Sequence, residues 1–203
     1  MAGRPRLLLT GFGPFPGAPR NPTAEVVARV AAHAGLGRDV EIVPRILPVT
    51  WAAVGAVADT LAAVAPDVVL HLGLARRARD IRVETRACNR AAVWAVDAAG
   101  RAPTSTTLEL DGPTHRAVRA PTRAMTARIA ALGLPARLSD DAGDYLCNAL
   151  LWRSLAGSAD RPTAFLHLPP TRALRRGGPV VDVPDLAAAT IAAIGALIGG
   201  CAA

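Results

Sequence analysis

Short apolar runs alternate along the chain with segments in which apolar residues recur every three or four positions. Short runs rich in Val, Ile and Leu, bounded by Gly, Pro or charged residues, are typical of buried β-strands. The strands predicted in this way are Arg6–Thr10, Val40–Ile46, Val68–Leu72, Ile81–Thr85 and Thr163–Leu168.

The segments between these runs have the spacing of amphipathic helices. Helices are predicted near Pro22–Ala34, Trp51–Val64, Pro121–Leu132 and Tyr145–Leu155, and a tail helix begins at Pro184–Asp185. Proline at the start of two of these segments fits its preference for the first helical turn. Alternation of strands and helices, without linkers or repeats, predicts an α/β layer fold with a largely parallel sheet and a single domain, residues 1–203.

Ligands of such folds gather at the carboxyl ends of the strands. We therefore expect chemistry in the loops that follow the predicted strands and in the approach to Cys147. The main candidates are Gly11–Asn21, Gly73–Arg79, the end of the Ile81 strand and His167–Thr171.

Two stretches depart from the alternation. Residues Arg90–Arg119 lack clean periodicity and are predicted to form an excursion or flap. The tail Leu186–Ala203 is uncharged, which makes it a candidate membrane span, but it is mostly Ala and Gly with few large side chains. We therefore favour a terminal helix docked on the domain, with no membrane as a partner.

The basic residues, which give a formal net charge of +7, narrow the classes of function that the chain could have. All 23 basic residues are Arg, and the absence of Lys excludes a Schiff-base lysine, a phosphate-loop lysine and a Ser–Lys dyad. An excess of basic over acidic residues is also typical of nucleic-acid-binding proteins. The arginines are scattered and aromatic residues make up 3% of the chain, so an RNA-binding domain remains only an alternative.

The three cysteines, Cys88, Cys147 and Cys201, have neither metal-ligand nor paired spacing. An odd number of unpaired cysteines is typical of the reduced cytoplasm. The early apolar run Leu7–Leu9 is too short for a signal sequence.

Cys147 lies where a short loop containing Gly143 runs into the helical segment Tyr145–Leu155. The first turn of a helix presents free N–H groups and a partial positive charge, and both favour thiolate over thiol. The thiolate is the nucleophilic form of cysteine. The alternative is that Cys147 is a small buried hydrophobic residue.

His167 closes the last predicted strand, and an imidazole there is suited to hold and move the proton of a thiol. Glu84, in the Ile81 strand, has the chemistry to orient that imidazole. Taken singly, His167 could be a core histidine, and Glu84 could be the ion-pair partner of Arg82 or Arg86.

The loop Thr10–Gly17 has the wrong glycine spacing for a dinucleotide fingerprint, and its prolines remove N–H groups that a pyrophosphate needs. Phe12 and Phe15 instead offer ring faces to a flat, uncharged ligand. Asn21 has both a donor and an acceptor, which suits an amide or lactam edge. The alternative is that both rings enter the core.

Five separated motifs occur in one order: Gly11–Phe15 with Asn21–Thr23, Gly73–Ala75, Glu84 with Asn89, Asp141–Asn148, and Phe165–Pro169. In the order and content of these motifs, the chain resembles the pyroglutamyl peptidase I (pyrrolidone-carboxylate peptidase, cysteine peptidase C15) family over nearly its whole length. The resemblance implies a three-layer α/β/α sandwich around a twisted, mostly parallel (mixed) sheet. It also implies removal of an N-terminal pyroglutamyl residue from peptides, a cytoplasmic location, no metal or other cofactor, and often a homo-oligomer, a dimer or tetramer.

The resemblance also implies roles for individual residues. Cys147 corresponds to the nucleophile, His167 to the general base and acid, and Glu84 to the orienting carboxylate. The residues implied to surround the lactam are Phe12 and Phe15 as a clamp, Asn21 at its polar edge, Tyr145 in the wall and the backbone around Leu74. The oxyanion would meet N–H groups of the first helical turn near Cys147.

The resemblance breaks at Trp94, which stands where the family usually has an Arg that assists the oxyanion. Arg90 and Arg101 are possible substitutes. Asp141 and Asp144 also place carboxylates before the nucleophile, where they oppose the helix effect unless they cap the helix and face away. These departures leave open a second hypothesis, a catalytically weak or inactive paralogue that binds pyroglutamyl peptides.

Overall fold

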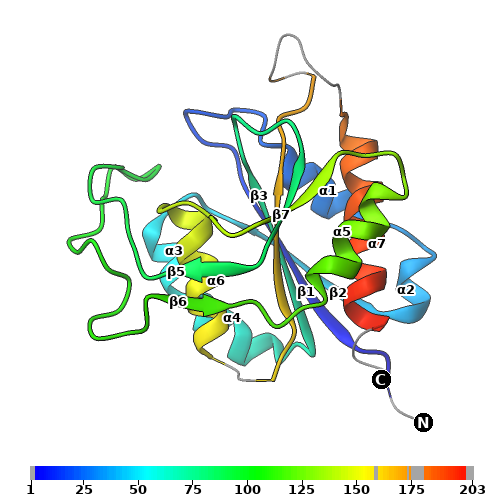
Figure 1. Ribbon diagram of the computed structural model, residues 1–203, viewed down its shortest axis with the longest axis horizontal. Helices are drawn as coiled ribbons and strands as arrows, with labels where there is room; N and C mark the ends of the chain where they lie inside the picture. Colours follow the sequence, from blue (N-terminus) through cyan, green and yellow to red (C-terminus); the bar gives the residue numbers. More distant parts are fainter. Residues whose placement is uncertain (1–2, 158–159, 173, 175–180, 200–203) are drawn as a thin grey trace.

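The computed structural model describes residues 3–157, 160–172, 174 and 181–199. The strands of its main sheet are β1 (Arg6–Phe12), β2 (Glu41–Leu47), β3 (Val68–Leu74), β4 (Ile81–Glu84), β7 (Ala136–Ser139) and β8 (Thr163–Leu168). They form a six-stranded sheet in the order β2-β1-β3-β8-β4-β7 (Figure 1). The predicted strands are confirmed, with bounds that differ by at most two residues.

The sheet is mixed. β2, β1, β3 and β8 are parallel to one another, whereas β4 pairs antiparallel with β8 and parallel with β7. The prediction of a mostly parallel sheet is therefore confirmed. β7 was not predicted because it is a short edge strand, in which the exposed Arg137 interrupts the apolar pattern.

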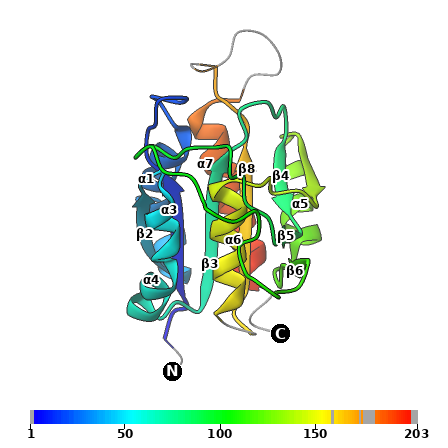
Figure 2. The same cartoon turned by 90° about the vertical axis from the view of Figure 1, so that its left-hand side faces the viewer.

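Helices cover both faces of the sheet. They are α1 (Pro22–Ala31), α2 (Leu36–Asp39), α3 (Trp51–Gly55), α4 (Val57–Val64), α5 (Thr122–Ala130), α6 (Leu146–Ala156) and α7 (Val183–Gly199). Side chains alternate along a strand, so Leu7 and Leu9 of β1 belong to the buried cluster that also contains residues of α1, α5 and α7. Leu8 belongs to the cluster on the other face, with residues of α3, α4 and α6 (Figure 2). The expected three-layer α/β/α sandwich is confirmed.

Helix boundaries follow the local sequence. Pro22 begins α1, and the side chain of Asn21 caps it by accepting a hydrogen bond from the Thr23 N–H. The segment predicted as one helix over Trp51–Val64 is instead two, α3 and α4, which meet at Ala56. Gly55 ends α3 at this break, and glycine destabilises a helix interior by about 1 kcal/mol relative to alanine.

The tail helix α7 is docked, as predicted. Leu186, Ile194 and Leu197 are fully buried in the cluster shared with α1 and α5. Within the described ranges, no helix has the length and apolar character that a membrane span requires. The final part of the predicted tail, including Cys201, lies outside the described residues.

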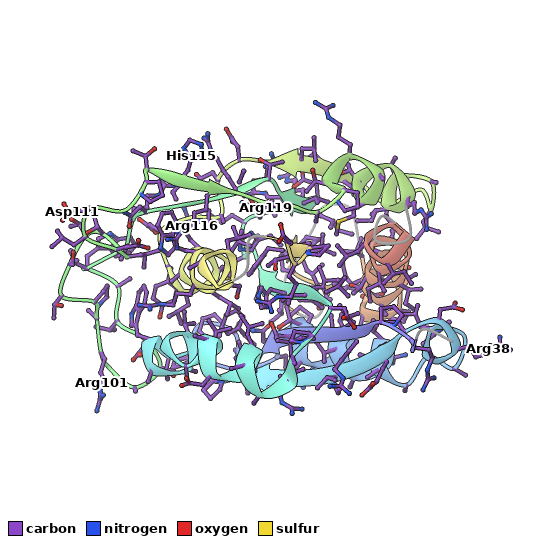
Figure 3. The ribbon with its side chains drawn as sticks, turned by 90° about the horizontal axis from the view of Figure 1, so that it is seen from below. Arg38, Arg101, Asp111, His115, Arg116 and Arg119 are labelled. Carbon is purple, nitrogen blue, oxygen red and sulfur yellow. The ribbon has the colours of Figure 1, made fainter. Side chains whose placement is uncertain are left out.

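The excursion predicted over Arg90–Arg119 leaves the main sheet. It begins and ends near a small antiparallel sheet of β5 (Arg86–Cys88) and β6 (His115–Ala117). Figure 3 shows Arg101 and Asp111 on the connecting chain, at the end of the molecule opposite α7. The absence of periodicity here therefore marks a real departure from the layered fold.

Candidate active site

Cys147 is the second residue of α6 and carries a free, half-buried thiol. Its sulfur lies against the end of β3. A Cβ built on Gly73 would come 2.8 Å from Sγ, so the glycine leaves room for the sulfur at the sheet. The N-cap residue Tyr145 makes no side-chain capping bond, so its side chain does not occupy the free N–H groups that the first turn of α6 presents.

His167 lies on β8 directly beside Gly73, its partner in the β3–β8 register. The imidazole hydrogen-bonds to the side chain of Cys147. Its Nδ1 lies 2.8 Å from Oε1 of Glu84, so the other ring nitrogen is the one available to the sulfur. The three side chains therefore form one hydrogen-bonded line.

The antiparallel direction of β4 determines how Glu84 reaches this line. Arg82 lies opposite His167, and Glu84, two residues further along on the same face, is diagonal to it and fully buried. Glu84 is the last residue of β4, so it lies, as expected, at the carboxyl end of its own strand. Because β4 runs antiparallel to β8, the carboxylate reaches His167 across this pair of strands.

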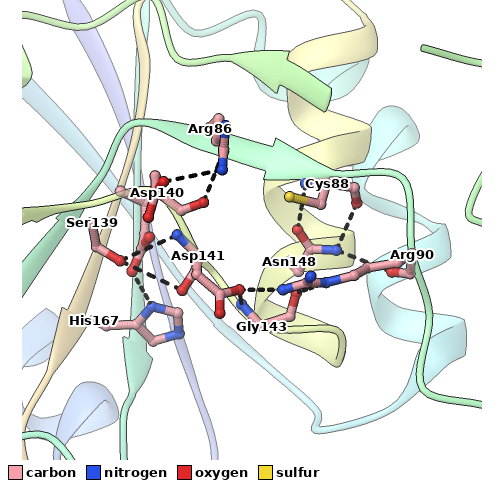
Figure 4. Close-up of polar contacts among 10 residues, drawn as sticks. Arg86, Cys88, Arg90, Ser139, Asp140, Asp141, Gly143, Asn148 and His167 are labelled. Atoms are coloured by element: carbon pink, nitrogen blue, oxygen red, sulfur yellow. Dashed lines mark hydrogen bonds and ion pairs between the residues drawn. The ribbon is translucent and has the colours of Figure 1, made fainter. Parts of the chain in front are cut away.

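The neighbouring arginines have other partners, so the alternative of a Glu84–Arg pair is wrong. Arg82 pairs with Asp80, and Arg86 pairs with Asp140 across the loop before α6 (Figure 4). Glu84 pairs with His167 instead.

The pKa of His167 is raised to about 9 from its ordinary value of 6.5. Burial alone would lower this pKa, because it disfavours the charged imidazolium. The negative charge of Cys147, the hydrogen bond to it and the Glu84 carboxylate together outweigh burial. Near neutral pH the raised pKa therefore favours the imidazolium form of His167.

A cavity of about 220 Å³ opens beside the sulfur. Its lining residues are Phe12, Phe15, Asn21, Val49, Leu74, Arg76, Tyr145, Leu146 and Cys147. The five residues expected to surround a ligand are thus gathered around one hollow. This volume is below the roughly 300–1,000 Å³ typical of pockets for drug-sized ligands, which suits a single small residue.

The loop after β1 holds its residues firmly. Asn21 accepts from the Thr23 N–H and donates to the carbonyl of Gly13, so its amide braces the loop. Phe12 is 4% exposed and belongs to the core as well as to the pocket wall, whereas Phe15 is half-buried. The alternative that the rings enter the core is therefore correct in part for Phe12.

Tyr145 closes the opposite wall. Its hydroxyl donates to the carbonyl of Val96 over 2.8 Å, and its ring packs edge-on against Trp51. Burial, followed by the negative charges of Asp97 and Cys147, raises the pKa of Tyr145 and keeps the hydroxyl protonated. The excursion is thereby attached to the pocket.

Asp97 fixes the excursion at this point. Its carboxylate accepts hydrogen bonds from the backbone N–H groups of Trp51, Ala99 and Arg101. Burial opposes the charge, but these donors outweigh it and lower the pKa of Asp97.

The segment that breaks the family pattern lies outside the pocket lining. Trp94 is 79% exposed. Arg90 pairs with Asp141 and donates to the carbonyl of Gly143 (Figure 4). Neither Arg90 nor Arg101 lines the cavity, so neither expected substitute reaches it. The pairing with Arg90 also gives Asp141 a cationic partner away from the cavity lining.

Two residues near the site were not predicted from the sequence. Arg76 lines the pocket from the loop after β3, where an exposed arginine resembles any solvated surface residue. His71 is fully buried on β3, between Oγ1 of Thr10 at 2.7 Å and Oγ of Ser154 at 2.9 Å. Burial, and then the charge of Arg161, lowers the pKa of His71 to about 3, so this histidine is neutral. Among the described residues, no group of His, Cys, Asp and Glu has a metal-binding arrangement.

Comparison with known proteins covers nearly the whole chain. The model of the family described as pyroglutamyl peptidase matches residues 5–198. The pyrrolidone-carboxylate peptidase of Clavibacter michiganensis subsp. michiganensis is 34% identical over 200 residues, covering 96% of this chain and 93% of that protein. The protein of the same name from Cupriavidus taiwanensis is 34% identical over 195 residues, with 92% and 88% covered. The structure of pyrrolidone carboxyl peptidase from Thermococcus litoralis aligns with a TM-score of 0.86 at 28% identity, covering 96% of this chain and 94% of that one.

Proposed function

The chain belongs to the pyroglutamyl peptidase family, and on this basis we propose that it removes an N-terminal pyroglutamyl residue from peptides by Cys147, His167 and Glu84 acting together. It is a hydrolase of this family. The proposal is carried by one observation, the hydrogen-bonded line of these three side chains beside a small pocket.

Substrate recognition is proposed to follow from the pocket walls. Pyroglutamate is a flat, neutral lactam without a free amine, so a site built around an ammonium group cannot hold it. The rings of Phe12 and Phe15 provide apolar faces, and the pocket lining contains no carboxylate to hold an ammonium. The Oδ1 of Asn21 already faces the N–H and the hydroxyl of Thr23, and one hydrogen of Nδ2 goes to the carbonyl of Gly13. We therefore propose that the second Nδ2 hydrogen donates to the lactam edge.

The first half of the reaction forms a thioester. The Cys147 thiolate attacks the pyroglutamyl carbonyl carbon, which forms a C–S bond and an oxyanion. The His167 imidazolium then gives its proton to the leaving amine nitrogen as the C–N bond breaks. Glu84 holds the ring at Nδ1 throughout.

The second half of the reaction hydrolyses the thioester and regenerates the free enzyme. Neutral His167 takes a proton from water while the water oxygen attacks the thioester carbon. Collapse of this second oxyanion breaks the C–S bond, releases the pyroglutamyl acid and restores the thiolate–imidazolium pair. We propose that N–H groups of the first turn of α6 bind both oxyanions, a contribution of about 3 kcal/mol for each donor.

A specific observation favours a second candidate, a protein that binds pyroglutamyl peptides without turnover. Trp94, at the position of the family's oxyanion-assisting Arg, is exposed and does not line the pocket. The first candidate requires the backbone donors of α6 to suffice without that guanidinium.

Hydrolysis of a chromogenic pyroglutamyl anilide separates the two candidates. We expect release of the chromogenic aniline by the native protein and none by Cys147→Ala, with Cys88→Ala as the matched control that keeps activity. Calorimetry of pyroglutamyl-alanine amide with Cys147→Ala checks that the pocket still binds. Binding without turnover by the native protein would favour the second candidate, and the absence of both would contradict each of them.

A further inference from the structure

Arg76 is a charged residue in the wall of the pocket, which it shares with Phe15 and Leu74. It also borders an adjacent hollow with Gly17, Ala18 and Pro170. The guanidinium therefore stands between the cavity beside Cys147 and the surface next to it.

The guanidinium has no carboxylate partner within ion-pair distance in the described part of the chain. Several other arginines are paired, including Arg82, Arg86 and Arg90. No acidic residue lines either hollow. The pocket thus has an uncompensated positive charge at its edge.

Gly17 provides the space for this arrangement. A Cβ built there would meet Cε2 of Phe15 at 2.9 Å and Nη1 of Arg76 at 3.0 Å. Both groups therefore lie beside the backbone of Gly17, and the guanidinium is next to the ring that is proposed to face the lactam. An anion bound by Arg76 would lie just outside the cavity rather than deep within it.

The position of Arg76 determines which part of a bound substrate it would contact. If the pyroglutamyl ring fills the small cavity and its carbonyl carbon meets Sγ, the rest of the peptide leaves through the opening where Arg76 stands. We propose that Arg76 is a specificity-determining residue that favours substrates with a carboxylate close to the scissile bond. This inference rests on the proposed function and names its preferred substrate class.

Two sources supply such a carboxylate. One is an Asp or Glu side chain directly after the pyroglutamyl residue, and the other is the free C-terminus of a pyroglutamyl dipeptide. Arginine binds carboxylates through paired N–H donors, but an exposed pair is weakened by solvent and by salt. The expected preference is therefore moderate, roughly twofold to fivefold in kcat/KM.

The test compares four peptides by release of the second residue's amine. The side-chain source is tested with pyroglutamyl-glutamic acid α-amide against pyroglutamyl-glutamine amide, in which a neutral amide replaces the side-chain carboxylate. The C-terminal source is tested with pyroglutamyl-alanine against pyroglutamyl-alanine amide. Each pair is measured with the native protein, with Arg76→Gln and with Arg77→Gln, an exposed neighbour outside both hollows.

We expect at least one carboxylate substrate to be preferred by the native protein and by Arg77→Gln, with the preference reduced in high salt. Arg76→Gln should lose that preference, measured as the ratio of kcat/KM between the carboxylate and the neutral member of each pair. The pair that shows the preference identifies the source. Equal preferences in the native protein and Arg76→Gln, or no preference in either pair, would overturn the inference.

Measurements of peptide binding test the role of Arg76 independently of turnover. The same peptides are titrated into Cys147→Ala and into Cys147→Ala/Arg76→Gln by calorimetry. Tighter binding of a carboxylate peptide only when Arg76 is present supports the inference even if the native protein turns over nothing. Equal affinities in the two variants would reject it, whatever the fate of the proposed function.

Discussion

Gly73 and Cys147 approach so closely that a Cβ on the glycine would lie 2.8 Å from Sγ. The same Cβ would meet the ring of Phe165 at 2.7 Å. Because Gly73 is also the register partner of His167, it sets the sulfur beside the imidazole. A residue without a side chain is therefore part of the geometry of the site.

Gly73→Ala should displace Sγ from His167. We expect kcat/KM and the rate of thiol alkylation near neutral pH to fall by about tenfold or more, with a loss of stability of about 1–3 kcal/mol from overpacking against Phe165. Gly55→Ala is the control, because a Cβ there meets nothing within 4 Å. Native alkylation kinetics in Gly73→Ala would show that the sulfur does not depend on this contact.

Glu84→Gln should lower the pKa of His167, because it removes a buried negative charge while keeping a similar shape. NMR titration of the imidazole is expected to show the shift, and kcat/KM should fall by about a hundredfold or more. Asp80→Asn, which removes the carboxylate partner of Arg82 on the same segment, is the matched control. An unchanged imidazole titration would contradict the role of Glu84.

His167 should make the protein less stable at alkaline pH. Its folded-state pKa of about 9 is above the ordinary value of 6.5, so the folded state binds the proton more tightly than the unfolded state. The associated stabilisation is fully present below about pH 6.5 and is lost as the pH rises through about 9. Urea unfolding across this range should show the decline in the native protein and a smaller decline in His167→Asn. Parallel curves for the two proteins would contradict the raised pKa.

His71 should act in the opposite direction. Its folded-state pKa of about 3 is below 6.5, so its contribution is present above about pH 6.5 and is lost as the pH falls towards 3. His71→Asn should reduce the acid dependence of urea unfolding, although loss of the hydrogen bonds to Thr10 and Ser154 lowers stability at neutral pH by about 1–3 kcal/mol. The exposed His33 provides the control substitution. Equal acid slopes in His71→Asn and the native protein would refute a neutral buried His71.

Asp97→Ala should release the excursion from the pocket wall. Three backbone N–H groups lose their acceptor, and we expect a loss of about 1–3 kcal/mol in local stability together with faster tryptic cleavage at Arg101. Asp111→Ala, on the same segment but exposed, is the comparison. Cleavage at an unchanged rate would mean that other contacts hold the segment.

Periodicity was sufficient to predict the layers, because β1, β3 and β8 are buried on both faces and the helices that cover them bury one stripe each. Cys147, His167 and the rings of Phe12 and Phe15 were predicted from their types, since a thiol at a helix start, an imidazole on a strand and paired aromatic rings have recognisable chemistry. Tyr145 and Leu74 were implied only by the family resemblance. The structure places all of them around one cavity or in contact with it. Their catalytic roles, the dimer or tetramer and the absence of nucleic-acid binding stay predictions.

Other features leave no trace in a one-dimensional pattern. The direction of β4 depends on which neighbour it pairs with, and a run such as Ile81–Glu84 has the same pattern in either direction. Arg76 has the composition of a surface residue and becomes distinctive only when the fold sets it beside Phe15. His71 is neutral because of Thr10 and Ser154, which come from separate elements.

The position of β8 in the sheet determines when the site can form during synthesis of the chain. This strand is the last of the sheet in sequence, yet it lies between β3 and β4, and the residues that pair across it, Glu84 and His167, are 83 apart. During synthesis Glu84 and Cys147 both leave the ribosome before His167. The line of these three side chains can therefore form only after β8 has been made and has inserted between β3 and β4.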